Sequence, residues 1–166
     1  MFKGKKYEDV DELFVQKPTW TSETKTVAIE IPEFLMKIDE KVYVKSPRFK
    51  LAGVEFYIRV TPGYKDREFV RVALVNVSDE DQTTSVTFTE DSGVERSWQM
   101  ETVEANRTWG LSDFLSHEDY KTWAKDHGDV FKLKARVTLH QKGKTAEDGW
   151  IRYVVIMYGW FGLAWC

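Results

Sequence analysis

Apolar and polar residues alternate with a period of two through most of this 166-residue chain. In residues 130–140, the odd-numbered side chains from Phe131 to Leu139 are apolar, and those between them are Lys, Arg or Thr. Residues 54–61 repeat the pattern. A half-buried strand sends successive side chains to opposite faces of its sheet, so this period predicts strands rather than helices. The chain is therefore expected to fold as a β-protein.

Turn residues divide this alternation into short segments. Pro62-Gly63 and Asp91-Ser92-Gly93 supply strong turn signals. Long amphipathic helices do not separate the segments, which argues against a parallel α/β fold. The sequence predicts an all-β fold, an antiparallel β-sandwich of about eight strands. The expected strands and extended pieces are residues 25–31, 41–44, 49–51, 54–61, 69–77, 83–90, 96–103 and 130–140.

The alternation also assigns side chains to the two faces of each strand. Arg59 on one strand, and Arg71 and Ala73 on the next, fall on the outward side. Trp98 and Met100 are assigned to the core side of residues 96–103. The other core residues expected on the central strands are Val54, Phe56, Ile58, Val60, Val70, Val72, Leu74, Val86 and Phe88.

One short helix is expected in the second half of the chain, over residues 117–125. Ser116 and Asp119 have the spacing of a capping box, with Asp in place of the usual Glu or Gln. Gly128 suits the left-handed conformation that often ends a helix. In the N-terminal lead-in, residues 7–15 also have apolar spacing that fits one or two helical turns.

Charge and cysteine content exclude several classes of protein. The net charge is −3 with both signs mixed along the chain, so no basic stripe collects phosphates and nucleic-acid binding is not expected. The single cysteine, Cys166, fits a reducing compartment. No apolar segment follows the basic start, so we expect a cytoplasmic protein, and the sequons at Asn76 and Asn106 are interpreted as chance matches.

Patterns for catalysis and metal binding are missing from the sequence. Nucleophile-elbow serines, catalytic cysteines and phosphate-binding glycine loops do not occur. His117, His127 and His140 lack the spacing of metal ligands, and the acidic residues 79–81 lack that of a calcium loop. The sequence predicts a protein that is not an enzyme and has no catalytic residues, metal site or cofactor.

The order of these segments resembles the MATH (meprin and TRAF homology) domain, also called the TRAF-like domain. The resemblance covers about residues 25–140. Its most specific part is the run Trp109-Gly110-Leu111-Ser112-Asp113-Phe114-Leu115, which precedes Ser116 to Asp119 and a closing strand. The other matching segments are residues 29–31 (IEI) with Phe34 behind them, 46–53 (SPRFKLAG), 56–63 (FYIRVTPG) and 69–74 (FVRVAL).

The resemblance implies a protein–protein interaction module, used as an adaptor. Such a domain binds an extended peptide of a partner protein in a shallow groove on one sheet, where backbone bonds give affinity and side-chain pockets give specificity. On this chain the expected peptide-binding residues are Arg59, Arg71, Ala73, Trp109, Gly110 and Leu111.

Two of these assignments have structural alternatives. Trp109 is interpreted either as a groove wall or as a core tryptophan that anchors a loop. Arg59 and Arg71 either bind a peptide carboxylate or form a solvated surface pair. The chain also departs from the family at groove positions: Leu111 replaces a common Phe, Ala73 a Tyr of the speckle-type POZ proteins, and Thr108 and Gly63 an Asp and an Arg of the deubiquitinase relatives. The scaffold therefore transfers to this chain, and the ligand preference does not.

The C-terminal segment differs from every earlier strand. Residues 153–166 carry no charge, but they are shorter than the roughly 20 residues of a membrane helix, so no membrane span is expected. Both faces of residues 151–158 are apolar, which requires burial on both sides or a covering chain. We expect residues 150–158 to form a hairpin with residues 130–140. The alternative function is a structural or assembly subunit that forms a homo-oligomer through residues 150–166, from Trp150 to Cys166.

Three parts of the chain follow from these interpretations. Residues 1–23 are an N-terminal lead-in, residues 24–140 are the sandwich, and residues 141–166 are a C-terminal hairpin and apolar tail.

Overall fold

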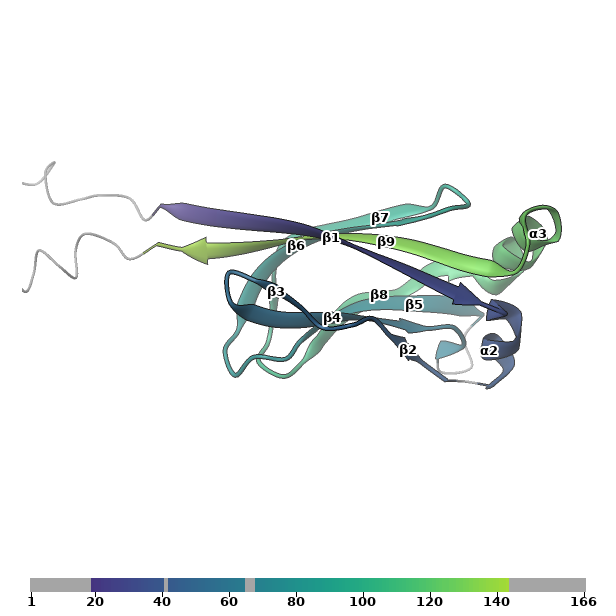
Figure 1. Cartoon of the computed structure of the whole chain (residues 1–166), viewed down its shortest axis with the longest axis horizontal. Helices are drawn as coiled ribbons and strands as arrows, with labels where there is room; N and C mark the ends of the chain where they lie inside the picture. The colour runs from purple at the N-terminus through teal and green to yellow at the C-terminus, as the bar shows by residue number, and fades with distance from the viewer. Residues whose placement is uncertain (1–18, 41, 65–67, 144–166) are drawn as a thin grey trace, which may run out of the picture. The chain divides into compact units, whose positions relative to one another are not determined.

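The computed structural model describes residues 19–40, 42–64 and 68–143. Residues 22–140 make one compact unit, and residues 19–21 and 141–143 belong to a second. The larger unit is an antiparallel β-sandwich, whose two sheets enclose one hydrophobic core (Figure 1). The predicted all-β class is therefore confirmed.

The first sheet, sheet A, has the strand order β1-β9-β6-β7. Its members are β1 (Trp20–Pro32), β6 (Gln82–Glu90), β7 (Glu95–Val103) and β9 (Val130–Lys142). Where β1 ends and β9 begins, the Glu33 N–H donates to the Asp129 carbonyl at 2.9 Å. Further along the same pair, the Thr24 and Thr138 hydroxyls are 2.8 Å apart. The first and the last strand of the described chain therefore lie side by side.

The expected hairpin partner of β9, residues 150–158, lies outside the described residues. Within the described chain, β1 occupies one edge of β9 and β6 occupies the other. A strand pairs through two edges only, so residues 130–140 have no open edge for a third partner. Alternation within residues 130–140 reveals that they form a strand, but it does not reveal which segments take their edges.

The second sheet, sheet B, has the order β2-β4-β5-β8, and β3 also pairs with β4. Its members are β2 (Val44–Lys45), β3 (Phe49–Leu51), β4 (Val54–Thr61), β5 (Phe69–Asn76) and β8 (Thr108–Ser116). Across the centre, Ile58 of β4 lies opposite Leu74 of β5, which lies opposite Trp109 of β8. β8 is therefore an edge strand of sheet B.

The core between the sheets contains the side chains that the alternation assigned to it. Phe56, Ile58 and Val60 of β4 are fully buried, as are the inward residues of β5 and β9. Val54, at the start of β4, is only partly buried. Burial of each such side chain stabilises the fold by about 1.5–3 kcal/mol, so this set accounts for much of the cohesion of the two sheets.

Met100 does not occupy the core position predicted for it. Trp98 is buried, whereas Met100 is 47% exposed and has a positive φ of 52°. The register between β6 and β7 shifts at this point, because two residues of β7 are opposite Ser85 alone. The Met100 N–H donates to the Ser85 hydroxyl at 3.0 Å. This β-bulge reverses the alternation beyond Trp98 and turns Met100 outward.

The predicted helix of the second half is confirmed as α3 (His117–His127). The Ser116 hydroxyl accepts a hydrogen bond from the Asp119 N–H at 3.1 Å, which satisfies one of the free donors of the first turn. Gly128 has a φ of 89°, and its N–H donates to the Ala124 carbonyl at 2.9 Å. Both ends of the helix were therefore readable from local sequence.

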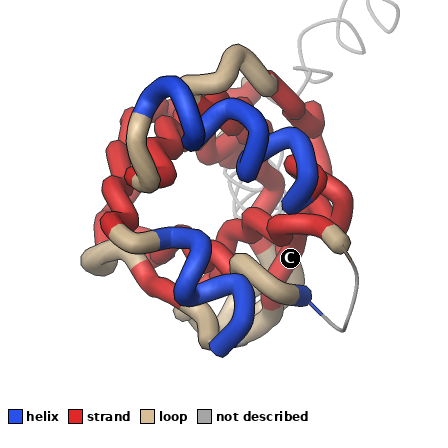
Figure 2. The backbone as a smooth tube through the Cα atoms, turned by 90° about the vertical axis from the view of Figure 1, so that its right-hand side faces the viewer, coloured by secondary structure: helices blue, strands red, loops and turns tan. Residues whose placement is uncertain are grey.

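A second helix, α2 (Phe34–Glu40), was not expected. The Leu35 N–H in its first turn donates to both carboxylate oxygens of Asp129, each at 3.2 Å. Phe34 is fully buried and stacks on Phe131, with ring centroids 4.4 Å apart. The two helices lie at the same end of the sandwich, in front of the strands in Figure 2. Residues 7–15, where other helical turns were predicted, lie outside the described residues.

Candidate functional site

The outer face of sheet B carries a cluster of cations and tyrosines. Lys45 of β2 lies directly opposite Arg59 of β4. Arg71 of β5 is opposite Thr61, two residues further along β4, so it lies diagonally from Arg59. We call this surface the cation–tyrosine face, defined by Lys45, Arg59 and Arg71 with Tyr43, Tyr57 and Tyr64.

Each cation of this face lies close to a tyrosine ring. The Arg59 guanidinium carbon is 5.5 Å from the centre of the Tyr43 ring, and the Lys45 ammonium is 5.4 Å from the same ring. The Lys45 ammonium is also 5.2 Å from the Tyr57 ring. The Arg71 guanidinium carbon lies 4.6 Å from the Tyr64 ring. These distances are within the range of cation–π attraction, which holds the cations near the sheet surface.

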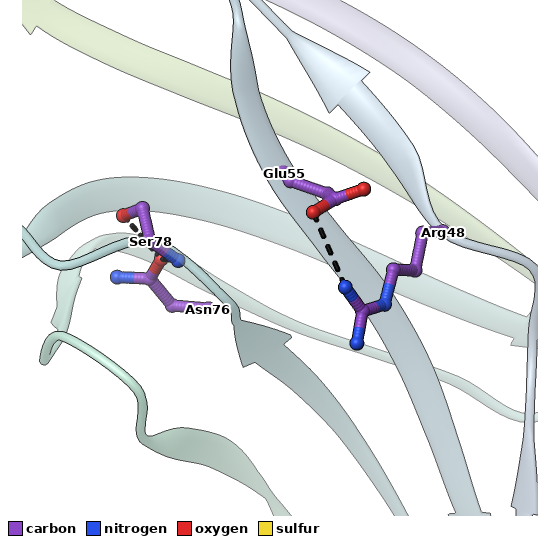
Figure 3. A network of polar contacts seen from close by, with 4 residues as sticks. All are labelled: Arg48, Glu55, Asn76 and Ser78. Carbon is purple, nitrogen blue, oxygen red and sulfur yellow. Dashed lines mark hydrogen bonds and ion pairs between the residues drawn. The ribbon is translucent and has the colours of Figure 1, made fainter.

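Carboxylates do not neutralise these cations within the described chain. The Glu55 carboxylate, which is on the same strand as Arg59, pairs instead with Arg48 at 3.4 Å (Figure 3). Among the described residues, neither Lys45, Arg59 nor Arg71 forms an ion pair. Like charges directly opposite each other across a strand pair are unfavourable. The Lys45–Arg59 pair therefore concentrates positive charge without a counter-ion among the described residues.

The two arginines lie down on the sheet rather than standing out in water. The Nε atoms of Arg59 and Arg71 are buried and have no hydrogen-bond acceptor among the described residues. Ala73 is on the same outward side, yet it is only 1% exposed. Long side chains of this face must therefore cover it. A buried donor without an acceptor costs about 1–3 kcal/mol, so the packing of these two side chains on the sheet carries a local energetic cost.

The structure divides the predicted peptide-binding residues between the two sides of sheet B. Arg59, Ala73 and Gly110 are neighbours in one row across β4, β5 and β8, and Arg71 lies on the same outer side. Trp109 and Leu111 alternate with Gly110 and therefore point to the other side of β8. They are opposite Leu74 and Val72, which are core residues.

Trp109 is nevertheless accessible, because β8 is an edge strand. Its side chain is 44% exposed, whereas Leu111 packs partly against the core. The interpretation of Trp109 as a fully buried anchor is therefore wrong. Trp109 stands beside the open edge of β8, on the side opposite to the cation–tyrosine face.

The backbone of β8 presents hydrogen-bonding groups at this open edge. The Asn76 N–H donates to the Arg107 carbonyl at 3.0 Å, which makes residues 76 and 107 a hydrogen-bonded pair of the β5–β8 ladder. Bonding alternates along an antiparallel strand, so residues 109 and 111 also bond toward β5. The N–H and C=O groups of Thr108 and Gly110 then point to the open edge, and the register shifts beyond Leu111. Beyond them, the Arg96 side chain of β7 donates to the Asp113 carbonyl at 3.4 Å.

Gly110 is required where β5 and β8 approach each other closely. A Cβ atom at this position would lie 2.5 Å from both the Ala73 Cβ and the Val72 carbonyl oxygen. Gly110 and Ala73 lie opposite each other, and both are small. They therefore leave a low strip, a part of the sheet surface without protruding side chains, across β5 and β8. Their contribution to a binding surface is this shape rather than a side-chain contact.

Four members of the cation–tyrosine face were not among the predicted site residues, namely Lys45, Tyr43, Tyr57 and Tyr64. Lys45 and Tyr43 lie at or beside the two-residue strand β2, whose pairing with β4 has no local signal. Tyr57 alternates with Arg59 on β4, so its outward position was readable from the period of two. The signal for Lys45 and Tyr43 therefore lies in the register between β2 and β4.

The histidines are engaged in structural contacts rather than grouped. His117 Nε2 lies within hydrogen-bond distance of the Pro62 carbonyl, and His140 Nε2 is 2.8 Å from the Ser85 hydroxyl. His127 stacks on Trp123 with ring centroids 4.6 Å apart. The described part of the chain contains no group of three or more His, Cys, Asp or Glu side chains placed to hold a metal ion. It also contains no helix long and apolar enough to cross a membrane.

The two sequons differ in accessibility. Asn76 is fully buried, and its Nδ2 donates to the carbonyls of Glu80, Val103 and Glu104 at 2.8, 3.0 and 3.3 Å. Its Oδ1 accepts from the Ser78 hydroxyl at 2.7 Å (Figure 3). Asn76 is therefore a structural residue that joins three segments, and no glycan fits there. Asn106 is exposed.

No protein-family model matches this sequence, and no curated protein is significantly similar to it.

Proposed function

We propose that this protein is an interaction module that binds an extended segment of a partner protein at sheet B. The observation that carries the proposal is the open edge of β8, where the backbone groups of Thr108 and Gly110 face away from β5 and the half-exposed Trp109 lies alongside. A segment added there would continue the sheet through main-chain bonds. The resemblance of residues 25–140 to MATH domains supports the same function.

Two surfaces flank the open edge and would supply specificity. Alternate side chains of an added strand point to opposite sides of the sheet. One set would meet Trp109, which offers a large, rigid apolar contact. The other set would pass over the low strip of Gly110 and Ala73 toward the cation–tyrosine face. The proposed module is a cytoplasmic adaptor without catalytic activity, cofactor or metal.

The test is selection of peptides from a random display library on the full chain, followed by affinity measurement with variants. Trp109→Ala should lower the affinity for the selected peptides by tenfold or more. Aromatic anchors that become buried in such interfaces contribute about 2 kcal/mol or more. Trp20→Ala is the matched control, because Trp20 on β1 is 51% exposed and belongs to sheet A. Equal affinity of the Trp109→Ala variant and the parent chain would refute the assignment of the site.

The alternative, an assembly subunit that associates through Trp150 to Cys166, depends on residues outside the described part of the chain. It stays a prediction from sequence.

A further inference from the structure

The cation–tyrosine face holds more positive charge than a single peptide carboxylate neutralises. Three cations meet within two neighbouring rows of sheet B, and none of them forms an ion pair within the described chain. Lys45 and Arg59 border the same Tyr43 ring at 5.4 and 5.5 Å. Apart from Glu55, which is committed to Arg48, the β2, β4 and β5 residues of this surface bring no negative charge to it.

A phosphate monoester matches this arrangement better than a carboxylate does. It carries a charge between −1.5 and −2 near neutral pH and three acceptor oxygens. Two guanidinium groups and one ammonium group on neighbouring strands offer more donors than the two oxygens of a carboxylate can accept from, which suits the three oxygens of a phosphate.

We infer that the cation–tyrosine face binds a phosphorylated side chain of the partner, carried where its segment leaves the open edge of β8 and crosses the outer face of sheet B, with Lys45, Arg59 and Arg71 as the phosphate ligands. This inference rests on the proposed function, since it specifies the ligand of the same sheet. β8 separates Arg71 on β5 from the open edge, and Arg59 on β4 and Lys45 on β2 lie one and two strands further in. The phosphorylated residue must therefore lie over the outer face of the sheet rather than within the strand paired to β8. Gly110 and Ala73 keep the path from the edge to this face free of bulky side chains.

Geometry also explains why the tyrosines belong to the site. Tyr43 and Tyr57 hold the Lys45 ammonium between them at 5.4 and 5.2 Å, and Tyr64 lies under the Arg71 guanidinium at 4.6 Å. The rings orient the cations without neutralising them, because a ring face attracts a cation but carries no net charge. The cations therefore remain available to an anionic ligand.

The experiment uses the full chain and three pools of synthetic degenerate eleven-residue peptides that differ only at the central position, which is serine, phosphoserine or glutamate. Fluorescence anisotropy should show that the phosphoserine pool binds about tenfold or more tightly than the serine pool, as expected for new charge-assisted hydrogen bonds. The glutamate pool should bind less tightly than the phosphoserine pool. Raising the salt concentration should lower the affinity of the phosphoserine pool more than that of the serine pool, because salt screens the attraction between charges.

Variants identify the residues responsible. Arg59→Gln and Arg71→Gln should each remove most of the preference for phosphoserine, measured as the ratio of the phosphoserine-pool and serine-pool affinities of the same variant. The exposed Lys45→Gln variant repeats the test without disturbing a partly buried side chain. Lys50→Gln is the matched control, because Lys50 is an exposed cation of the same sheet that lies opposite Glu55.

The outcomes separate the two proposals. Binding of the serine and phosphoserine pools with equal affinity, or a preference that survives in all three variants, would overturn the phosphate inference and leave the peptide-binding function standing. If neither these pools nor the display library yields a binding peptide, the proposed function itself is overturned. A preference for glutamate equal to that for phosphoserine would reassign the face to acidic peptides.

Discussion

The Tyr120 hydroxyl donates a hydrogen bond to Asp129 Oδ1 at 2.9 Å and thereby connects α3 to the start of β9. The same carboxylate accepts the Leu35 N–H of α2. Tyr120 is fully buried and lies edge-on to Phe34, with ring centroids 4.8 Å apart. One carboxylate thus fastens both helices to the end of the sandwich.

Replacement of Asp129 by alanine should destabilise the fold by about 2–4 kcal/mol. The change removes the cap of α2, worth about 1 kcal/mol, and leaves the buried Tyr120 hydroxyl without its acceptor, at a cost of about 1–3 kcal/mol. Urea denaturation would measure the free energy of unfolding. Asp126→Ala is the control, because Asp126 is an exposed carboxylate of α3 and should change stability by less than about 0.5 kcal/mol. Equal effects of the two variants would contradict the role of Asp129.

Stability should also fall in alkaline solution because of Tyr120. Burial, and then the hydrogen bond to Asp129, raise the pKa of the Tyr120 hydroxyl well above its ordinary value. Above about pH 10 the tyrosine ionises in the unfolded chain but stays protonated in the folded one. The unfolded state then binds fewer protons, so the free energy of unfolding declines by up to about 1.4 kcal/mol per pH unit.

This alkaline effect should be absent from the Tyr120→Phe variant. Comparing the free energies of unfolding of the parent and the variant from pH 8 to 11 isolates Tyr120, because the lysines and other tyrosines titrate in both proteins. Parallel curves for the two proteins would show that Tyr120 ionises as easily in the folded state as in the unfolded one.

Local signals in the sequence were sufficient for most strands and for α3, but not for α2. The cap of α3 lies within four residues, from Ser116 to Asp119, and a capping box can be read directly. The cap of α2 is Asp129, 94 residues away from Leu35. The local sequence does not predict this helix, because the residue that caps it is distant in the sequence. The prediction that Met100 is a core residue was wrong for a related reason, since the bulge that turns it outward depends on how β7 pairs with β6.

The candidate site shows the same limit. The period of two correctly placed Arg59 and Arg71 on the outer side of sheet B. It could not show that Lys45 joins them, because the β2–β4 register is set by the whole sheet. Trp109 and Gly110 were grouped as one site, although the same period of two sends adjacent residues of a strand to opposite sides, as it does in β8.

Asn76→Ala should destabilise the protein by about 3 kcal/mol. Buried carbonyls that lose their donor, and the Ser78 N–H that loses its acceptor at 2.9 Å, cannot recover these bonds from water. Thermal and urea unfolding would measure the loss. Asn106→Ala provides a sequon-matched control, because the Asn106 side chain makes one exposed bond to Asp79 at 3.2 Å. A loss below about 1 kcal/mol for Asn76→Ala would show that its network is not a major source of stability.

Gly110→Ala tests how closely β5 and β8 must approach. The added methyl group would meet the Ala73 Cβ and the Val72 carbonyl oxygen at 2.5 Å, so the strands must separate. Overpacking of this kind costs about 1–3 kcal/mol. Native-state hydrogen exchange should detect the separation as faster exchange at the Trp109 and Leu111 amides, which bond toward β5. Ser112→Ala, a change of similar size on the same strand, should leave both amides protected. If Gly110→Ala left their exchange unchanged, the close Gly110–Ala73 pair would not be what holds the edge strand in place.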